Sequence, residues 1–219
     1  MNTIIACESI KPELENVKKR VDDVQILYLP QNLHRMPHKL KEALQEAIDK
    51  TGPEDGRIIL GFGLCSNAVV GLKAPSQGLF IPRVHDCISF YLGSRERYMW
   101  LFNNYPGTYY LTVNWMEKKT DPLGLMENEY TERVGREMAE EAMQLEIKNY
   151  KYIGFINTTK ESGKWLKRAK ENASYFNKEF IEYRGKDQLF IKILFGPHDE
   201  PDFVYVKPDE KVKQNEFLK

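Results

Sequence analysis

Four residues with reactive side chains each follow an apolar run that is typical of a buried β-strand. They are the chain's only three cysteines and one of its four histidines: Cys7, Cys65, His85 and Cys87. Because parallel strands end at the same edge of a sheet, these side chains can converge. Thiolates and imidazoles are typical zinc ligands. The pattern therefore predicts a metal site with Cys7, Cys65 and His85 as ligands, and with Cys87 as a fourth ligand or an adjacent thiol.

The same cysteines allow other interpretations. Cysteine often behaves as a small buried hydrophobe, and it can also be a redox or nucleophilic thiol. An iron–sulfur cluster on the three cysteines is a further alternative. For Cys87 we expect a position in the first turn of a helix capped by Asp86, where the helix dipole lowers a thiol pKa. His85 could add to this lowering or take a proton, whereas Asp86 alone would oppose it.

Charged residues adjoin the predicted ligands, and we predict catalytic roles for three of them: Glu8, Arg83 and Asp86. Glu8 and Asp86 would orient the metal ligands or exchange protons. Arg83 would hold an anionic group of the substrate, because a guanidinium binds carboxylates and phosphates well.

A glycine-containing turn after the third predicted strand offers a second kind of site. Its residues Gly61, Gly63, Ser66 and Asn67 could form a backbone cradle for a polar or anionic group of a cofactor. The turn lacks the G-x-G-x-x-G and Walker patterns, and a tight turn that needs glycine for close packing is an equal alternative. His34, in a loop, could reach the same cleft or serve as a lower axial ligand of cobalt.

The elements that must position these residues alternate between strands and helices. This alternation predicts an α/β fold with a mainly parallel sheet and flanking helices, which is Rossmann-like. We expect either two β/α lobes, 1–116 and 117–219, or one continuous domain. The remaining predictions are a helix at 86–103, a loop at 117–128, a helix at 129–149, strand-like runs at 189–194 and 203–206, and a frayed tail at 207–219.

Composition excludes several classes of function. Among 219 residues, 32 Lys and Arg balance 32 Asp and Glu, so no global field attracts nucleic acid or an anionic membrane. No apolar stretch has the roughly 18 residues of a membrane span, and the first residues lack a basic signal-peptide region. We expect a cytoplasmic protein whose cysteines are thiols or metal ligands rather than disulfides.

Four segments together resemble one protein family. IIACE, GFGLCSN, IPRVHDCISFYLGSRERY and PGTYYLT are similar to the DUF1638 family of archaeal and bacterial proteins. The matching motif positions are Cys7, Glu8, Gly61, Gly63, Cys65, Asn67, Arg83, His85, Asp86 and Cys87. The resemblance implies an association with corrinoid-dependent methyl transfer in anaerobes, and hence a role in one-carbon metabolism.

These observations lead to one main expectation and one alternative. The main expectation is a zinc-binding α/β protein of anaerobic one-carbon metabolism that assists or catalyses methyl transfer. The alternative is a non-catalytic accessory protein that binds a corrinoid, a small molecule or a partner methyltransferase. The chain lacks the D-x-H-x-x-G pattern common in cobalamin-binding domains, which disfavours a conventional corrinoid carrier. Whether the protein is an enzyme, and how its subunits associate, stay open.

Overall fold

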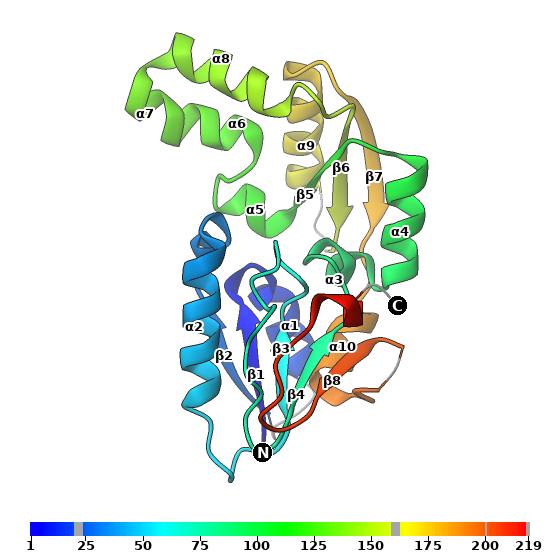
Figure 1. Cartoon of the computed structure of the whole chain (residues 1–219). Coiled ribbons are helices and arrows are strands. Elements are labelled where there is room, and N and C mark those ends of the chain that lie inside the picture. Colours follow the sequence, from blue (N-terminus) through cyan, green and yellow to red (C-terminus); the bar gives the residue numbers. More distant parts are fainter. Residues whose placement is uncertain (20–23, 159–162, 200, 218–219) are drawn as a thin grey trace. The chain divides into compact units, whose positions relative to one another are not determined.

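The computed structural model describes residues 1–19, 24–158, 163–199 and 201–217. It divides into two compact units, Met1–Arg95 with Asp187–Lys219 and Glu96–Lys186. Both units are shown in Figure 1. The expected division at 116 and 117 differs from these boundaries, because the chain returns to the first unit after residue 186 to complete its sheet. The second unit is thus an insertion in the first.

The first unit contains a five-stranded sheet. Its strands are β1 (Asn2–Cys7), β2 (Val24–Leu29), β3 (Ile58–Gly61), β4 (Leu79–Pro82) and β8 (Phe203–Val206). Their order is β2-β1-β3-β4-β8. The first four strands are parallel, and β8 pairs antiparallel to β4. The predicted mainly parallel α/β sheet is therefore confirmed, with one antiparallel edge strand.

Short and long helices flank this sheet. They are η1 (Glu8–Ile10), α1 (Lys11–Lys18), η2 (Gln31–Arg35), α2 (Pro37–Asp49), α3 (Ile88–Leu92), α10 (Gln188–Phe195) and η4 (Gln214–Phe217). On α2, Leu40 and Leu44 pack into one core cluster with Ile5 and Leu60 of the strands. Because side chains alternate along a strand, Gly61 faces the other side of the sheet, toward Ile10 at the end of η1.

The second unit has a smaller, fully parallel sheet of β5 (Thr108–Thr112), β6 (Tyr152–Asn157) and β7 (Glu179–Arg184), in that order. Its helices are α4 (Arg95–Asn104), α5 (Val113–Glu117), α6 (Pro122–Gly124), the π-helical segment η3 (Leu125–Tyr130), α7 (Thr131–Val134), α8 (Arg136–Ile147) and α9 (Gly163–Tyr175). Ala169 and Ala173 of α9 pack against Ile153 and Phe155 of β6. A separate cluster joins α6, η3 and α8.

Two predicted helices are each interrupted at a glycine. The expected helix at 86–103 is divided into α3 and α4 at Gly93, whose φ is 86°. The expected helix at 129–149 is divided into α7 and α8 at Gly135, whose φ is 79°. Positive φ angles are readily adopted by glycine alone. The spacing of the apolar residues continues across both glycines. It therefore predicted the helices but not the breaks within them.

Three other predictions were wrong. The expected loop at 117–128 contains α6 and most of η3. The strand-like run at 189–194 lies in the helix α10, because a short, almost continuous apolar run has no sequence periodicity that separates strand from helix. The tail was expected to be frayed, but Val212 and Phe217 are buried in the core of the first unit. Residues 218–219 lie outside the described part.

Among the described residues, none of the helices combines the length and the hydropathy that a membrane span requires.

Candidate functional site

Cys7 ends strand β1 and is held by the turn that follows it. Its side chain is 2% exposed. The Cys7 Sγ accepts hydrogen bonds from the Ser9 backbone N–H at 3.3 Å and from the Ser9 hydroxyl at 3.0 Å. It also lies 3.8 Å from Nδ1 of His34. The sulfur therefore has a fixed position at the carboxyl end of the strand, as the sequence predicted.

Cys65 lies in a strained turn after β3. Cys65, Ser66 and Asn67 have consecutive φ angles of 45°, 57° and 66°, a left-handed conformation that non-glycine residues rarely adopt and that costs on the order of 1 kcal/mol per residue. The side chains of Ser66 and Asn67 are exposed, whereas Cys65 is buried. The left-handed turn thus directs only the thiol inward.

Backbone hydrogen bonds join this turn to the segment that follows β4. The Leu64 N–H donates to the Val84 carbonyl and the Cys65 N–H donates to the His85 carbonyl, both at 3.0 Å. A Cβ on Gly63 would lie 2.5 Å from the Val84 oxygen, so only glycine permits the approach. The close-packing interpretation therefore accounts for Gly63. Gly61 is similar, because its Cβ would lie 2.7 Å from the Cβ of Ala6.

Asp86 and Cys87 stand at the start of helix α3. The Asp86 Oδ1 accepts the Ile88 N–H at 2.9 Å, but the N-cap residue of α3 is Cys87, so the helix begins one residue later than predicted and Cys87 precedes its first turn. The expected lowering of the Cys87 pKa is wrong. Although Cys87 is only partly buried by its exposed area, loss of solvent around its thiol raises its pKa well above the usual value, and Asp86, Cys7 and Cys65 add to this effect. Helix α3 has only five residues, too few for a strong dipole.

The three thiols influence one another electrostatically. The pKa of Cys65 is raised to about 12, first by burial and then by Cys7, with a smaller contribution from Asp86, while a backbone hydrogen bond from Gly63 opposes the shift. Cys7 and Cys65 likewise raise the pKa of Cys87. Cys7 and Cys65 also belong to one core cluster, so these two thiols are near each other, and Cys65 and Cys87 stay neutral near pH 7.

His34 belongs to this cluster more closely than the sequence suggested. Its ring stacks on Phe62 with centroids 5.9 Å apart, and its Nδ1 lies 3.2 Å from the Gln31 carbonyl oxygen. Burial lowers the His34 pKa. The Glu8 carboxylate accepts the Gln31 N–H at 3.3 Å. Glu8 therefore stabilises the loop that presents the imidazole to Cys7.

Other predicted site residues have different surroundings. His85 provides the carbonyl that binds Cys65, and its side chain is half-buried. The buried Arg83 guanidinium donates to the carbonyls of Phe203 and Glu216, which links β4 to β8 and η4. The predicted role of Arg83 in binding an anion stays a prediction, as does the cofactor cradle at Ser66 and Asn67.

The donor types suit a soft metal, but the side chains are not arranged as a complete ligand set. Within residues 1–19, 24–158, 163–199 and 201–217, no group of three or more His, Cys, Asp or Glu side chains is placed so that it could hold a metal ion. The cysteine cluster has suitable ligand chemistry, but ion binding would require its side chains to move.

A polar network in the second unit was missed by the sequence analysis. Asp121 is 1% exposed. Its Oδ2 accepts hydrogen bonds from Asn172 Nδ2 at 2.8 Å, Arg168 Nε at 3.1 Å and the Gly124 N–H at 3.2 Å. Beside the network lies a cavity of about 540 Å³. The available signals were the Asp-Pro-Leu-Gly segment, typical of a helix start, and the four-residue spacing of Arg168 and Asn172 on one helix face.

Comparison with known proteins identifies one family. The model of a family described as a protein of unknown function (DUF1638) matches residues 28–194. Cys7 and Glu8 precede the matched segment. No curated protein and no solved structure gives a significant match to the chain.

Proposed function

The chain belongs to the DUF1638 family, and we propose that it is a metal-binding α/β protein of anaerobic one-carbon metabolism, with zinc as its ion. The single observation that supports the proposal is that Cys7, which ends β1, and Cys65, which follows β3, lie in one core cluster, with Cys87 close enough to be influenced by both. Brought together, three cysteines from separate segments of the chain would form a soft donor set, the kind that selects zinc over magnesium or calcium.

The ligand assignment places the three thiols first and an imidazole fourth. His34 is a candidate because its Nδ1 is 3.8 Å from the Cys7 sulfur, and His85 is a candidate because its backbone is bonded to Cys65. Glu8 would keep the His34 loop in place, and Asp86 would orient the start of α3 beside Cys87.

Metal binding would have to draw these ligands together. Burial raises the pKa of Cys65 and Cys87, so each thiol keeps its proton until a cation replaces it. Binding would therefore release protons and strengthen as the pH rises. Zinc would supply a Lewis acid that lowers the pKa of a substrate thiol.

The finer assignments rest on other observations. The parallel order β2-β1-β3-β4 favours a Rossmann-like relationship, in which ligands bind beyond the carboxyl ends of the strands. The family resemblance favours methyl transfer to a thiol acceptor, with the protein acting as a methyltransferase or as its partner. An oxygen-sensitive iron–sulfur cluster on the same cysteines is the competing metal centre.

A second candidate function is a non-catalytic accessory protein that binds a corrinoid or another small molecule. The cavity in the second unit favours a small molecule rather than the much larger corrinoid, because a volume of about 540 Å³ lies in the usual range of sites for drug-sized ligands. A visible spectrum of anaerobically purified protein separates these possibilities, since corrinoids and iron–sulfur clusters are coloured and zinc is not.

The decisive experiment is elemental analysis of tag-free protein purified without oxygen. We expect about one zinc per chain, as for a single structural or catalytic site, and a much lower content in Cys65→Ser. His34→Ala should weaken zinc binding, whereas His38→Ala, which removes an exposed imidazole four residues away, should not. Absence of stoichiometric metal, or unchanged loading in Cys65→Ser, would contradict the proposal.

A further inference from the structure

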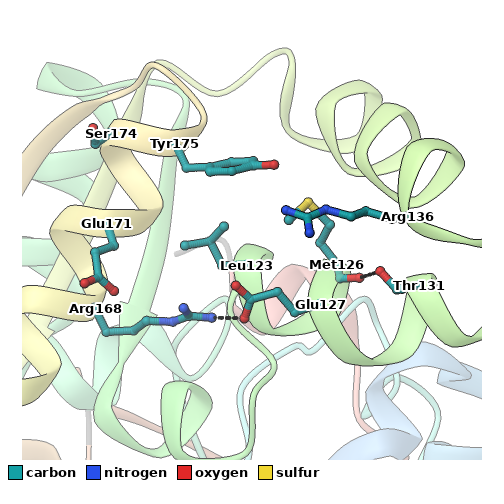
Figure 2. A pocket seen from close by; sticks show the side chains of 9 residues that line it. All are labelled: Leu123, Met126, Glu127, Thr131, Arg136, Arg168, Glu171, Ser174 and Tyr175. Atoms are coloured by element: carbon teal, nitrogen blue, oxygen red, sulfur yellow. Dashed lines mark hydrogen bonds and ion pairs between the residues drawn. The ribbon is translucent and has the colours of Figure 1, made fainter.

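The second unit contains a cavity formed by one continuous stretch of the chain and by helix α9. It lies between η3, α7 and the start of α8 on one side and α9 on the other, and its volume is about 540 Å³. Figure 2 shows Leu123 and Met126 between the charged side chains that line it, with the Tyr175 ring to one side. Leu123 and Met126 are 5% and 4% exposed, so they form an apolar floor.

One wall of the cavity is negatively charged. Arg168 donates from Nε to the buried Asp121 at 3.1 Å and from Nη2 to Glu127 at 2.9 Å. A single guanidinium between two carboxylates leaves this triad with a net charge of −1. Glu171, on the same helix as Arg168, adds a further carboxylate, whose nearest ion-pair partner is Lys167 at 3.9 Å. Lys167 offsets the charge of Glu171, so the wall keeps the net charge of −1 of the Arg168 triad and attracts a cationic group.

The opposite wall carries a positive charge. Arg136 is the first residue of α8, and its exposed side chain lines the cavity. Within the part of the chain that the structure describes, Arg136 forms no ion pair with an acidic side chain. Figure 2 shows its guanidinium across the cavity from Arg168 and Glu171. The N-terminal end of a helix also favours an anion there.

Hydrogen bonds of the Asp121 network fix the floor of the cavity in place. The π-helical segment η3 carries Met126 and Glu127, and such segments often occur at functional sites. Asn172, which is fully buried, donates to Asp121 and accepts the Leu123 N–H at 3.0 Å. Asp121 has a second oxygen, Oδ1, that is buried and has no hydrogen-bond partner among the described residues. A buried polar atom without a hydrogen-bond partner is uncommon and points to a bound group that completes its contacts.

We propose that this cavity binds a small zwitterion whose anionic end pairs with Arg136, whose cationic end faces Glu127 and Glu171, and whose apolar middle covers Leu123 and Met126. The charges of the two walls and the apolar floor between them match a linear ω-amino acid better than a simple anion, cation or hydrocarbon. The site lies outside the cysteine cluster, and its test does not depend on metal binding by the cysteines.

The test is a calorimetric titration of the full chain with three probes of equal length: 6-aminohexanoate, hexanoate and hexylamine. We expect 6-aminohexanoate to bind at least about tenfold more tightly than either probe with one charge, because a charge-assisted contact contributes that much or more. Equal binding of hexylamine and 6-aminohexanoate would overturn the proposal, and so would the absence of binding by all three at millimolar concentration.

Variants locate the binding. Arg136→Gln should weaken 6-aminohexanoate about tenfold and leave hexylamine unchanged, whereas Glu171→Gln should weaken hexylamine and leave hexanoate unchanged. The matched control is Arg133→Gln, which removes an exposed arginine of α7 that pairs with Glu129 at 3.2 Å and does not line the cavity. Unaltered affinity of Arg136→Gln for 6-aminohexanoate would refute the assignment of the anionic end.

Discussion

The cysteine edge of the first unit and the Asp121 network of the second unit bury reactive groups in opposite ways. At the cysteine edge, burial keeps the thiols of Cys65 and Cys87 neutral by raising their pKa values. In the network, a carboxylate is 1% exposed and is surrounded by three hydrogen-bond donors. The first arrangement avoids charge, and the second compensates it.

This difference determines how strongly the stability of each region depends on the polar partners of its buried groups. A neutral thiol is only weakly polar, so its burial needs few partners. An ionised carboxylate requires every partner to be in place, since the loss of one leaves a buried charge or donor unsatisfied. The cysteine edge should therefore tolerate changes in its side chains, and the network should not. The predictions below test this contrast, beginning with the largest effect.

Removing the central carboxylate of the network should have the largest effect on stability. Asp121→Ala leaves Arg168 and the buried Asn172 without their shared acceptor, so the free energy of unfolding of the second unit should fall by about 3 kcal/mol or more. Native-state hydrogen exchange in α9 and β6 measures this loss without requiring the two units to unfold together.

The matched control is the other carboxylate that Arg168 binds. Glu127 is half-exposed, so Glu127→Ala should lower the free energy of unfolding by less than about 1 kcal/mol. Comparable losses for the two variants would show that burial does not set the importance of the acidic partner, and the contrast between the two regions would fail.

At the cysteine edge the sensitive element is the backbone rather than a side chain. In Gly63→Ala the added methyl would lie 2.5 Å from the Val84 oxygen and 3.1 Å from the Asp86 nitrogen, and neither backbone atom can move freely. We expect a loss of about 1 to 3 kcal/mol and faster alkylation of Cys65 as its turn separates from the β4 segment. Urea unfolding and thiol labelling measure the two effects.

Gly163 provides the comparison for this substitution. A Cβ at this first residue of α9 would meet no atom of the described residues within 4 Å, so Gly163→Ala should be neutral or stabilising by up to about 1 kcal/mol. If Gly63→Ala is as harmless as Gly163→Ala, close approach is not the reason for glycine at position 63.

Local sequence patterns predicted much of the fold but not its division. The strand at Val24–Leu29 and the helix that starts at Pro37 were predicted with the observed first residues, because apolar periodicity and proline are local signals. The return of the chain to the first unit depends on pairing of β8 with β4, a contact between distant segments. The apolar run of α10 carried no periodicity that could have identified it as a helix.

The candidate site was predictable in its location and less so in its chemistry. The position of Cys7 and Cys65 after parallel strands follows from the rule that such strands end at one edge. The size of the rise in the Cys87 pKa could not be predicted, because it depends first on burial and also on two distant cysteines; only the contribution of the neighbouring Asp86 is local in the sequence. The proximity of His34 to Cys7 depends on a loop that Glu8 holds. The Asp121 network joins residues about 50 positions apart, which leaves only weak local signals.

The smallest predicted effect concerns pH. All four histidines lie in the first unit. Burial, aided by Arg57, lowers the pKa of His198, although hydrogen bonds to Ile193 and Lys192 and the charge of Asp199 oppose this shift. The folded protein thus keeps this imidazole neutral, while the unfolded chain takes up a proton as the pH falls below the usual histidine value.

The stability that comes from neutral His198 is therefore present above about pH 6.5 and is lost on acidification. One such group changes the free energy of unfolding by at most about 1.4 kcal/mol per pH unit. His198→Gln should reduce the slope of stability against pH in this range, and His38→Gln, at an exposed position, should leave it unchanged. Hydrogen exchange should locate the reduced slope in β4, β8 and α10 and find none in β6, because the second unit contains no histidine. An unchanged slope in His198→Gln would mean that acid acts on carboxylates in both units, and the two regions would then respond to pH alike.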